Sequence, residues 1–377
     1  MGQKDVNVEL LRLLACLLVI VVHIRPAMLL DGKVMNGALL MQTLTSVAVG
    51  SFFLISGFFT PNSPSVRKTW KRFLSGVLGP AFCYVIAVML LNEWIASRTG
   101  ILESLAAAFS DLPGLLGRLF RGTAAFNAGE YSIYTGHLWF VFSYALIMLW
   151  FPIIRLLIRN GTQRVLLFFV LLAFYRLLII DITNTWPIPM ILYLPELVPV
   201  EVLCFVIGYL LYQRREKLSG RLLVSACLCG LLLLLFCAMF LLQKNQFVLK
   251  LSEGVSSAEL NLQSPYYLSW NSGLGVVAST VFAAFILSLP TKGERLSGLI
   301  RSLGSLTYPV YLVHFAIVAK LISSGVNDRV QEAMHAQTAA GAVLYTLSYA
   351  LFIFLLSGAL VLLLRAVRRQ LARCHKS

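Results

Sequence analysis

The sequence predicts an all-α fold: a polytopic bundle of about ten transmembrane helices, forming a single domain over residues 1–377. Of the 377 residues, 59% are hydrophobic and 12% are charged, whereas soluble domains are roughly half apolar. The apolar residues gather in runs, and a run of about 20 crosses the hydrocarbon core as a helix. The longest stretch outside these runs, 95–136, is too short for a separate soluble domain. The predicted spans are 8–29, 43–60, 73–94, 137–158, 164–181, 197–213, 221–243, 269–290, 303–323 and 340–364.

The distribution of charge predicts how these spans are oriented. The net charge is +15, and with the N-terminus inside, most of the 31 Lys and Arg residues fall in cytoplasmic segments, while the acidic residues lean to the outer side. This alternation follows the positive-inside rule. We therefore expect both termini in the cytoplasm. The basic excess gives no reason to expect a nucleic-acid partner, whereas the apolar surface requires a lipid bilayer.

The seven cysteines do not point to a redox or metal function. Six of them lie within predicted spans, and none forms a C-x-x-C pair or a metal-spaced set. We expect them to be small apolar side chains of the bundle, and no metal site is predicted.

The first span carries two ionisable residues that are costly to bury. In RLLACLLVIVVH, Arg12 and His23 are eleven positions apart, which is about 20° beyond three full helical turns and about 16 Å along the axis. They therefore share one helix face. Ionisable residues deep in a span usually face the bundle interior or a wet cavity, so this face is expected to line a cleft. The alternative is that Arg12 snorkels to the inner headgroups and His23 caps the outer helix end.

Four segments resemble, in order, the motifs of one family. R-x10-H in ELLRLLACLLVIVVH is followed by SFFLISGFF in the second span, GHLWFVFSYALIMLWFPII in the fourth and LTYPVYLVHFAI near the C-terminus. Together they are similar to the acyltransferase type 3 family of integral-membrane acyltransferases. The resemblance implies about ten spans and transfer of an acyl group, commonly acetyl, from cytoplasmic acyl-CoA to a sugar hydroxyl of a cell-surface polysaccharide or its lipid-linked precursor. With the Lys/Arg bias, it also implies a bacterial inner membrane.

Within this interpretation, a cleft along the first span would join the cytoplasmic donor to the sugar acceptor. Neutral His23 is expected to act as general base on the sugar hydroxyl, because imidazole titrates near neutral pH. Arg12 is expected to hold a phosphate or carbonyl group of CoA, or to stabilise a neighbouring charge. Acetyl-CoA, or another acyl-CoA such as succinyl-CoA, is then a co-substrate, and no permanently bound cofactor is predicted. Direct transfer and a covalent acyl-His intermediate both remain open.

A basic segment, VRKTWKRF, follows the second span. Its cations suit the phosphates of CoA, and they are Arg67, Lys68, Lys71 and Arg72. The family commonly has an arginine pair spaced R-x-x-R in this loop, whereas here Lys68 and Lys71 have that spacing, so the exact anchors stay open. The alternative is ordinary positive-inside charge in contact with anionic lipids.

The ninth span carries a third candidate group. His314 is expected near mid-depth, with Tyr308 and Tyr311 on the same helix. It either joins the predicted cavity as a substrate contact or hydrogen-bonds a neighbouring helix.

The outer entrance of the fourth span carries the remaining candidates for substrate binding. His137 and Trp139, in GHLWF, either bind the acceptor or belong to an aromatic belt at the membrane interface. Glu130, just before this segment, is a candidate hydrogen-bond partner for the sugar.

A transporter or flippase of a lipid-linked glycan is the main alternative function. Arg12, His23 and His314 would then contact the substrate or protons inside the membrane. The basic segment discriminates between the two, because an acyltransferase is expected to bind acyl-CoA there and a transporter has no such need.

Overall fold

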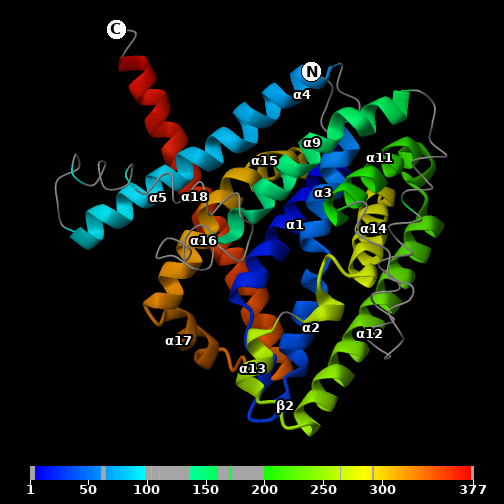
Figure 1. Cartoon of the computed structure of the whole chain (residues 1–377), viewed down its shortest axis with the longest axis vertical. Helices are drawn as coiled ribbons and strands as arrows, with labels where there is room; N and C mark the ends of the chain where they lie inside the picture. The colour runs from blue at the N-terminus through cyan, green and yellow to red at the C-terminus, as the bar shows by residue number, and fades with distance from the viewer. Residues whose placement is uncertain are drawn as a thin grey trace.

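The computed structural model describes residues 5–60, 65–97, 103, 110, 136–159, 170, 199–263, 265–290 and 293–374. In this part of the chain nearly all regular structure is helical, and one short hairpin supplies the strands. The predicted all-α membrane bundle is therefore confirmed (Figure 1). Six of the described helices are long and apolar enough to cross a membrane, and up to eight spans result if each of two bent helix pairs forms one span.

The predicted number of ten spans is not confirmed. Apart from Val170, the predicted span 164–181 lies outside the described residues. The predicted span 197–213 corresponds to α11 (Val200–Leu218), whose last turn carries Arg215 and Lys217. Because charged residues occupy this end of α11, it does not meet the criteria for a candidate membrane span.

The described elements follow one another as α1 (Val6–Ile24), β1 (Leu29–Leu30), β2 (Lys33–Val34), α2 (Asn36–Thr45), α3 (Ala48–Phe59), α4 (Val66–Phe73), the π-helical turn η2 (Leu74–Leu78), α5 (Gly79–Ser97), the 3-10 turn η3 (Gly136–Leu138), α9 (Trp139–Arg159), α11, α12 (Leu222–Ser252), α13 (Ser257–Leu262), η5 (Tyr266–Leu268), α14 (Gly273–Ser288), α15 (Glu294–Gly304), α16 (Thr307–Ser323), α17 (Val326–Ala333) and α18 (Ala339–Cys374).

Helix α1 is the central element of the bundle. It packs against α2, α3, α14, α15, α16 and α18. The Asp5 side chain caps its start by accepting hydrogen bonds from the backbone N–H groups of Asn7 and Val8. The Asn7 side chain in turn donates to the carbonyl of Leu289, at 2.8 Å, just after α14. These bonds satisfy polar groups at the helix end and anchor α1 to its neighbour.

The first helix is shorter than predicted. It ends at Ile24 rather than at residue 29, because Pro26 cannot continue the hydrogen-bond pattern. Strands β1 and β2 follow as a small antiparallel hairpin. Asp31 and Gly32 form its turn with positive φ, the conformation that an Asp-Gly pair favours.

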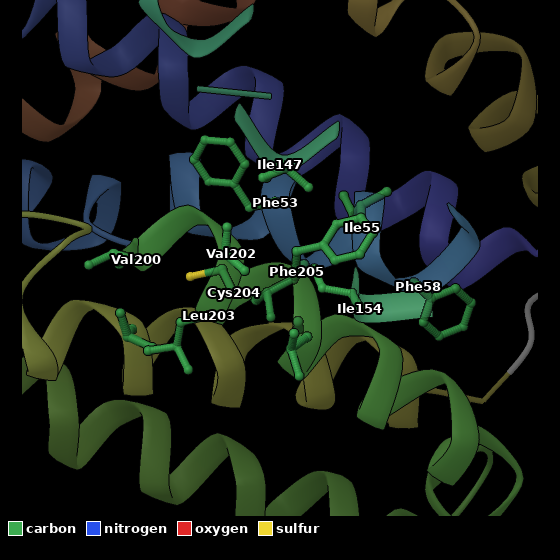
Figure 2. Packing of buried hydrophobic residues seen from close by; sticks show 14 of the residues in the cluster. Phe53, Ile55, Phe58, Ile147, Ile154, Val200, Val202, Leu203, Cys204 and Phe205 are labelled. Carbon is green, nitrogen blue, oxygen red and sulfur yellow. The ribbon is translucent and has the colours of Figure 1, made fainter. Parts of the chain in front are cut away.

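Helices α3 and α11 pack backbone to backbone. A Cβ added at Gly208 would collide with the carbonyl of Leu54, and one added at Gly57 would collide with the carbonyl of Phe205. Small residues at such a crossing let membrane helices approach closely. Around it lies a buried apolar cluster, in which Figure 2 shows side chains of α3, α9 and α11 together.

Helix α4, the turn η2 and α5 form one continuous helical stretch. The predicted loop after the second span is therefore shorter than expected, since α4 begins at Val66 and the Ser65 side chain caps it by accepting from the N–H of Lys68. Consequently, the basic segment is helical, and it leads directly into η2.

Both termini lie toward the same end of the molecule, where α4 also begins (Figure 1). This arrangement agrees with two termini on one side of a membrane. Along α12 and α18, leucines such as Leu234 and Leu363 remain exposed. An apolar surface of this kind is stable only in contact with lipid, so the protein is a multi-pass membrane protein.

The α3–α11 crossing is expected to be sensitive to one added methyl group. Replacing Gly208 by Ala should lower the free energy of unfolding by about 1–3 kcal/mol, because the two backbones must move apart. The measurement is the thermal unfolding midpoint in detergent micelles. Gly230→Ala on α12 is the matched control, since a Cβ there meets no atom within 4 Å, and its midpoint should be unchanged or higher. Equal midpoints for the two variants would contradict this packing.

Candidate active site

A cavity of about 310 Å³ lies among α1, α3, α9, η2 and α16. Arg12 lines it, as the sequence predicted for a cleft along the first span. The other lining residues are mostly aromatic or small, and they are Phe52, Ile55, Ser56, Phe59, Thr60, Gly76, Val77, Phe140, Tyr144, Thr307, Tyr308 and Tyr311. A second cavity, of about 420 Å³ between α2 and α12, contains no histidine and no charged side chain. The first cavity is therefore the candidate for chemistry.

The guanidinium of Arg12 is held by a carboxylate that sequence analysis did not single out. Its Nη1 lies 2.8 Å from Oε1 of Glu9, one helical turn earlier on α1. The Glu9 side chain is 3% exposed and that of Arg12 is 26% exposed, so the pair is largely removed from water. Glu9 also lies against the backbone of Gly304, where a Cβ would collide with its carboxylate. The i, i+3 spacing of an acid and a base within one predicted span was the available signal.

Three histidines from distant parts of the sequence lie close to one another, next to the part of the cavity wall that Tyr311 forms. His23 comes from the last turn of α1, His137 from η3 and His314 from the middle of α16. The ring centroid of His314 lies 5.5 Å from that of His23 and 5.4 Å from that of His137. The ring of Phe315, which sequence analysis also missed, packs at 4.7 Å from His23 and 5.0 Å from His137. These contacts define the histidine cluster: His23, His137 and His314.

The hydrogen bonds of the cluster leave imidazole nitrogens available. Nδ1 of His314 lies 2.8 Å from the carbonyl of Tyr311 and must donate, since a carbonyl oxygen only accepts. In the neutral ring Nε2 of His314 is then an acceptor, and it is buried without a hydrogen bond to any residue that the structure describes. His314 is fully buried and His137 is 3% exposed, whereas His23 is half-buried. Unsatisfied buried nitrogens of this kind are suited to a polar ligand.

Burial also affects the charge of His137, which lies in η3, just before the candidate span that begins at Trp139. The pKa of His137 is held well below its ordinary value, chiefly by burial and then by the neighbouring imidazoles of His314 and His23. His137 is therefore neutral at physiological pH and can accept a hydrogen bond.

The prediction that Arg12 and His23 line the same cleft holds only in part. Arg12 lines the cavity and His23 does not. Tyr311 lines the cavity and also contacts the histidine cluster, since its ring centroid is 5.1 Å from that of His137 and 5.8 Å from that of His314. Tyr308, also predicted as a candidate, lines the same cavity.

The four predicted cations all lie on α4 and are exposed. None of them lines the cavity, but the residues that follow do, since Gly76 and Val77 of η2 form part of its wall. The helical stretch α4–η2 therefore leads from the basic segment to the cavity wall.

Two predicted candidates are not part of this region as described. Trp139 stacks on Trp270, with ring centroids 5.7 Å apart, and packs against the large apolar cluster rather than the histidines. Glu130 lies outside the described residues. His137, for which an interfacial belt was the alternative, is instead buried in the cluster. Among the described residues, no group of three or more His, Cys, Asp or Glu side chains has the geometry to hold a metal ion.

A family model described as an acyltransferase domain matches residues 5–364. The search of curated proteins and the search of solved structures each found no match. The matched range contains every residue of the cavity and of the histidine cluster, and the resemblance of the four sequence segments is confirmed. With this match over nearly the whole chain, the protein belongs to the acyltransferase type 3 family and is a membrane enzyme that transfers acyl groups.

Proposed function

We propose that this enzyme is an acyl-CoA-dependent O-acyltransferase, which moves an acetyl group from acetyl-CoA to a sugar hydroxyl of a cell-surface polysaccharide or its lipid-linked precursor. The bias of Lys and Arg favours a bacterial inner membrane as its location. The observation that carries the proposal is the buried histidine cluster next to the cavity lined by Arg12. Transfer to a hydroxyl needs a proton acceptor in a site poor in water, and neutral imidazole is suited to that role.

In the proposed reaction, His23 is the general base. Its imidazole removes the proton of the sugar hydroxyl while the hydroxyl oxygen forms a bond to the thioester carbonyl carbon. The carbon–sulfur bond then breaks, and the leaving thiolate takes the proton from the imidazolium. The products are the O-acyl sugar and free CoA, and His23 is neutral again. The acceptor nitrogen of His314 is suited to orienting the sugar hydroxyl, because its other ring nitrogen is engaged with the Tyr311 carbonyl.

Arg12 and the basic segment are the proposed donor contacts. A guanidinium has five N–H donors, so Arg12 can pair with Glu9 and still donate to a carbonyl or phosphate oxygen of CoA. The exposed cations of α4 suit the phosphates of the nucleotide. Between the two, the pantetheine arm would follow η2 into the cavity, since η2 directly continues α4.

The flippase or transporter alternative lacks an observation in its favour. Membership of a family of acyl-transferring enzymes argues for chemistry. The connection from the basic segment to the cavity also fits a phosphate-bearing donor better than a glycan in transit.

Loss of the proposed base is expected to reduce the rate strongly. His23→Ala should lower acyl transfer by ~10²–10⁴-fold, the usual contribution of a positioned general base. The measurement is transfer of radiolabelled acetyl from acetyl-CoA to glycan in proteoliposomes. The exposed His335 provides the matched control, and His335→Ala should transfer at the native rate. Near-native transfer by His23→Ala would exclude His23 as the base.

Neutralising the basic segment is expected to weaken donor binding. Changing Arg67, Lys68, Lys71 and Arg72 together to Gln should raise the Kd for CoA by about tenfold, since each exposed cation contributes modestly to phosphate binding. The measurement is binding of radiolabelled CoA at low salt, and the difference should shrink at high salt.

The control for this experiment is a second set of exposed cations on the same end of the molecule. Arg365, Arg368 and Arg369 of α18 are exposed, and changing them to Gln should leave the Kd unchanged. An equal loss of binding in both variants would assign the effect to overall charge and contradict a specific phosphate site.

A further inference from the structure

Tyr311 contacts both the cavity and the histidine cluster. Its ring forms part of the cavity wall, and it packs edge-on against His137. Its hydroxyl donates a hydrogen bond to the backbone carbonyl of His137. The side chain therefore reaches from α16 to η3, and its ring contacts both the cavity and the imidazoles of His137 and His314.

Other aromatic side chains hold the Tyr311 ring in this position. Tyr308 stacks on it with an interplanar angle of 17° and a centroid distance of 6.3 Å. The Tyr308 hydroxyl in turn donates to the carbonyl of Val77 in η2. Phe140 packs edge-on at 5.7 Å and Phe52 lies at 6.5 Å. Aromatic rings from α3, α9 and α16 thus pack together around Tyr311. The hydrogen bond of Tyr308 to Val77 connects this group of rings to η2.

We propose that Tyr311 is a specificity-determining residue whose ring forms a partition between the cavity and His23. In its closed position the ring keeps water from the cytoplasmic cavity away from His23. The donor thioester passes only when the ring is displaced. That the passing group is the thioester of acyl-CoA rests on the proposed function. That the Tyr311 ring limits access to the histidines does not depend on it. A base that can activate a sugar hydroxyl can also activate water, and attack of water on the thioester would yield the free acid and CoA. Exclusion of water therefore protects the donor from hydrolysis.

The chemistry of the partition suits a reversible opening. Rotation of the Tyr311 side chain breaks its hydrogen bond to the His137 carbonyl and its stacking on Tyr308. Side chains that rotate in this way respond to a ligand that binds the open arrangement better than the closed one. A donor that fills the cavity and extends past the ring would be such a ligand.

The test compares the accessibility of individual histidines. Inside-out membrane vesicles are treated with diethyl pyrocarbonate, which modifies neutral imidazole nitrogens, and the rate at each histidine is read by peptide mass spectrometry. In Tyr311→Ala, we expect His23 and His314 to react about tenfold faster than in the native protein. Tyr311→Phe keeps the ring and should remain close to the native rate. Equal rates at His23 in native protein and Tyr311→Ala would overturn the proposal.

Two controls separate opening of the partition from general disruption. Tyr212→Ala removes a ring of the same size from α11, where it packs on Phe58 outside the cavity, and should leave the histidine rates unchanged. The exposed His335 should react equally in all variants. If Tyr311→Ala does not accumulate as folded protein, Tyr311→Leu decides, because it removes the ring and keeps an apolar side chain. A native rate at His23 in that variant would then overturn the proposal.

A second measurement distinguishes failure of the partition from failure of the proposed function. Acetyl-CoA hydrolysis without any sugar acceptor should rise several-fold in Tyr311→Ala and stay at the native level in Tyr212→Ala. Faster histidine modification without faster hydrolysis would support the partition and contradict His23 as the base that activates water for attack on the thioester. No change in either measurement would overturn the partition.

Discussion

Burial of polar groups along α1 is the constraint on which the rest of the structure depends. A charge or an imidazole inside an apolar bundle is costly unless it is paired or faces a ligand. At the start of α1 the cost is offset by pairing, since Glu9 binds Arg12 at 2.8 Å. At its end, His23 lies beside two further imidazoles rather than beside an acid. The first arrangement is suited to holding a donor, and the second to moving a proton.

The packing around α1 makes both arrangements possible. Because α1 packs against several helices, its polar residues meet different neighbours: Asn7 bonds to Leu289 after α14, and His23 packs against His314 of α16. Gly304 leaves room for the Glu9 carboxylate, and α16 brings His314 and Tyr311 to the end of α1. The glycines of the α3–α11 crossing bring these two helices close, and α3 in turn packs against α1 and lines the cavity. The glycine contact between α3 and α11 thus helps to position the polar groups of α1, because α3 packs against both helices.

Much of the fold was predictable, because a bilayer imposes long apolar helices and a charge bias that a single sequence reveals. Helix ends were less predictable: Pro26 ends α1 earlier than hydropathy alone suggests, and α4 begins inside the predicted loop. In the site, the spacing of Arg12 and His23 predicted a shared helix face. The meeting of His137 with His314 was not predictable, since it depends on tertiary contacts between segments far apart in the sequence. The position of Tyr311 next to the histidines was not predictable for the same reason. Nor was the finding that Arg12 lines the cavity while His23 does not.

The most direct test of the central claim, that the Arg12–His23 face joins the cytoplasm to the reaction centre, is a cryo-EM structure of the enzyme in lipid nanodiscs with a thioether analogue of acetyl-CoA. The account predicts the nucleotide phosphates against α4, the pantetheine arm through the cavity beside Arg12, and the thioether sulfur close enough to His23 for one hydroxyl group to bridge them. An analogue bound away from α4, or a thioether group that faces lipid and has no path to His23, would contradict it.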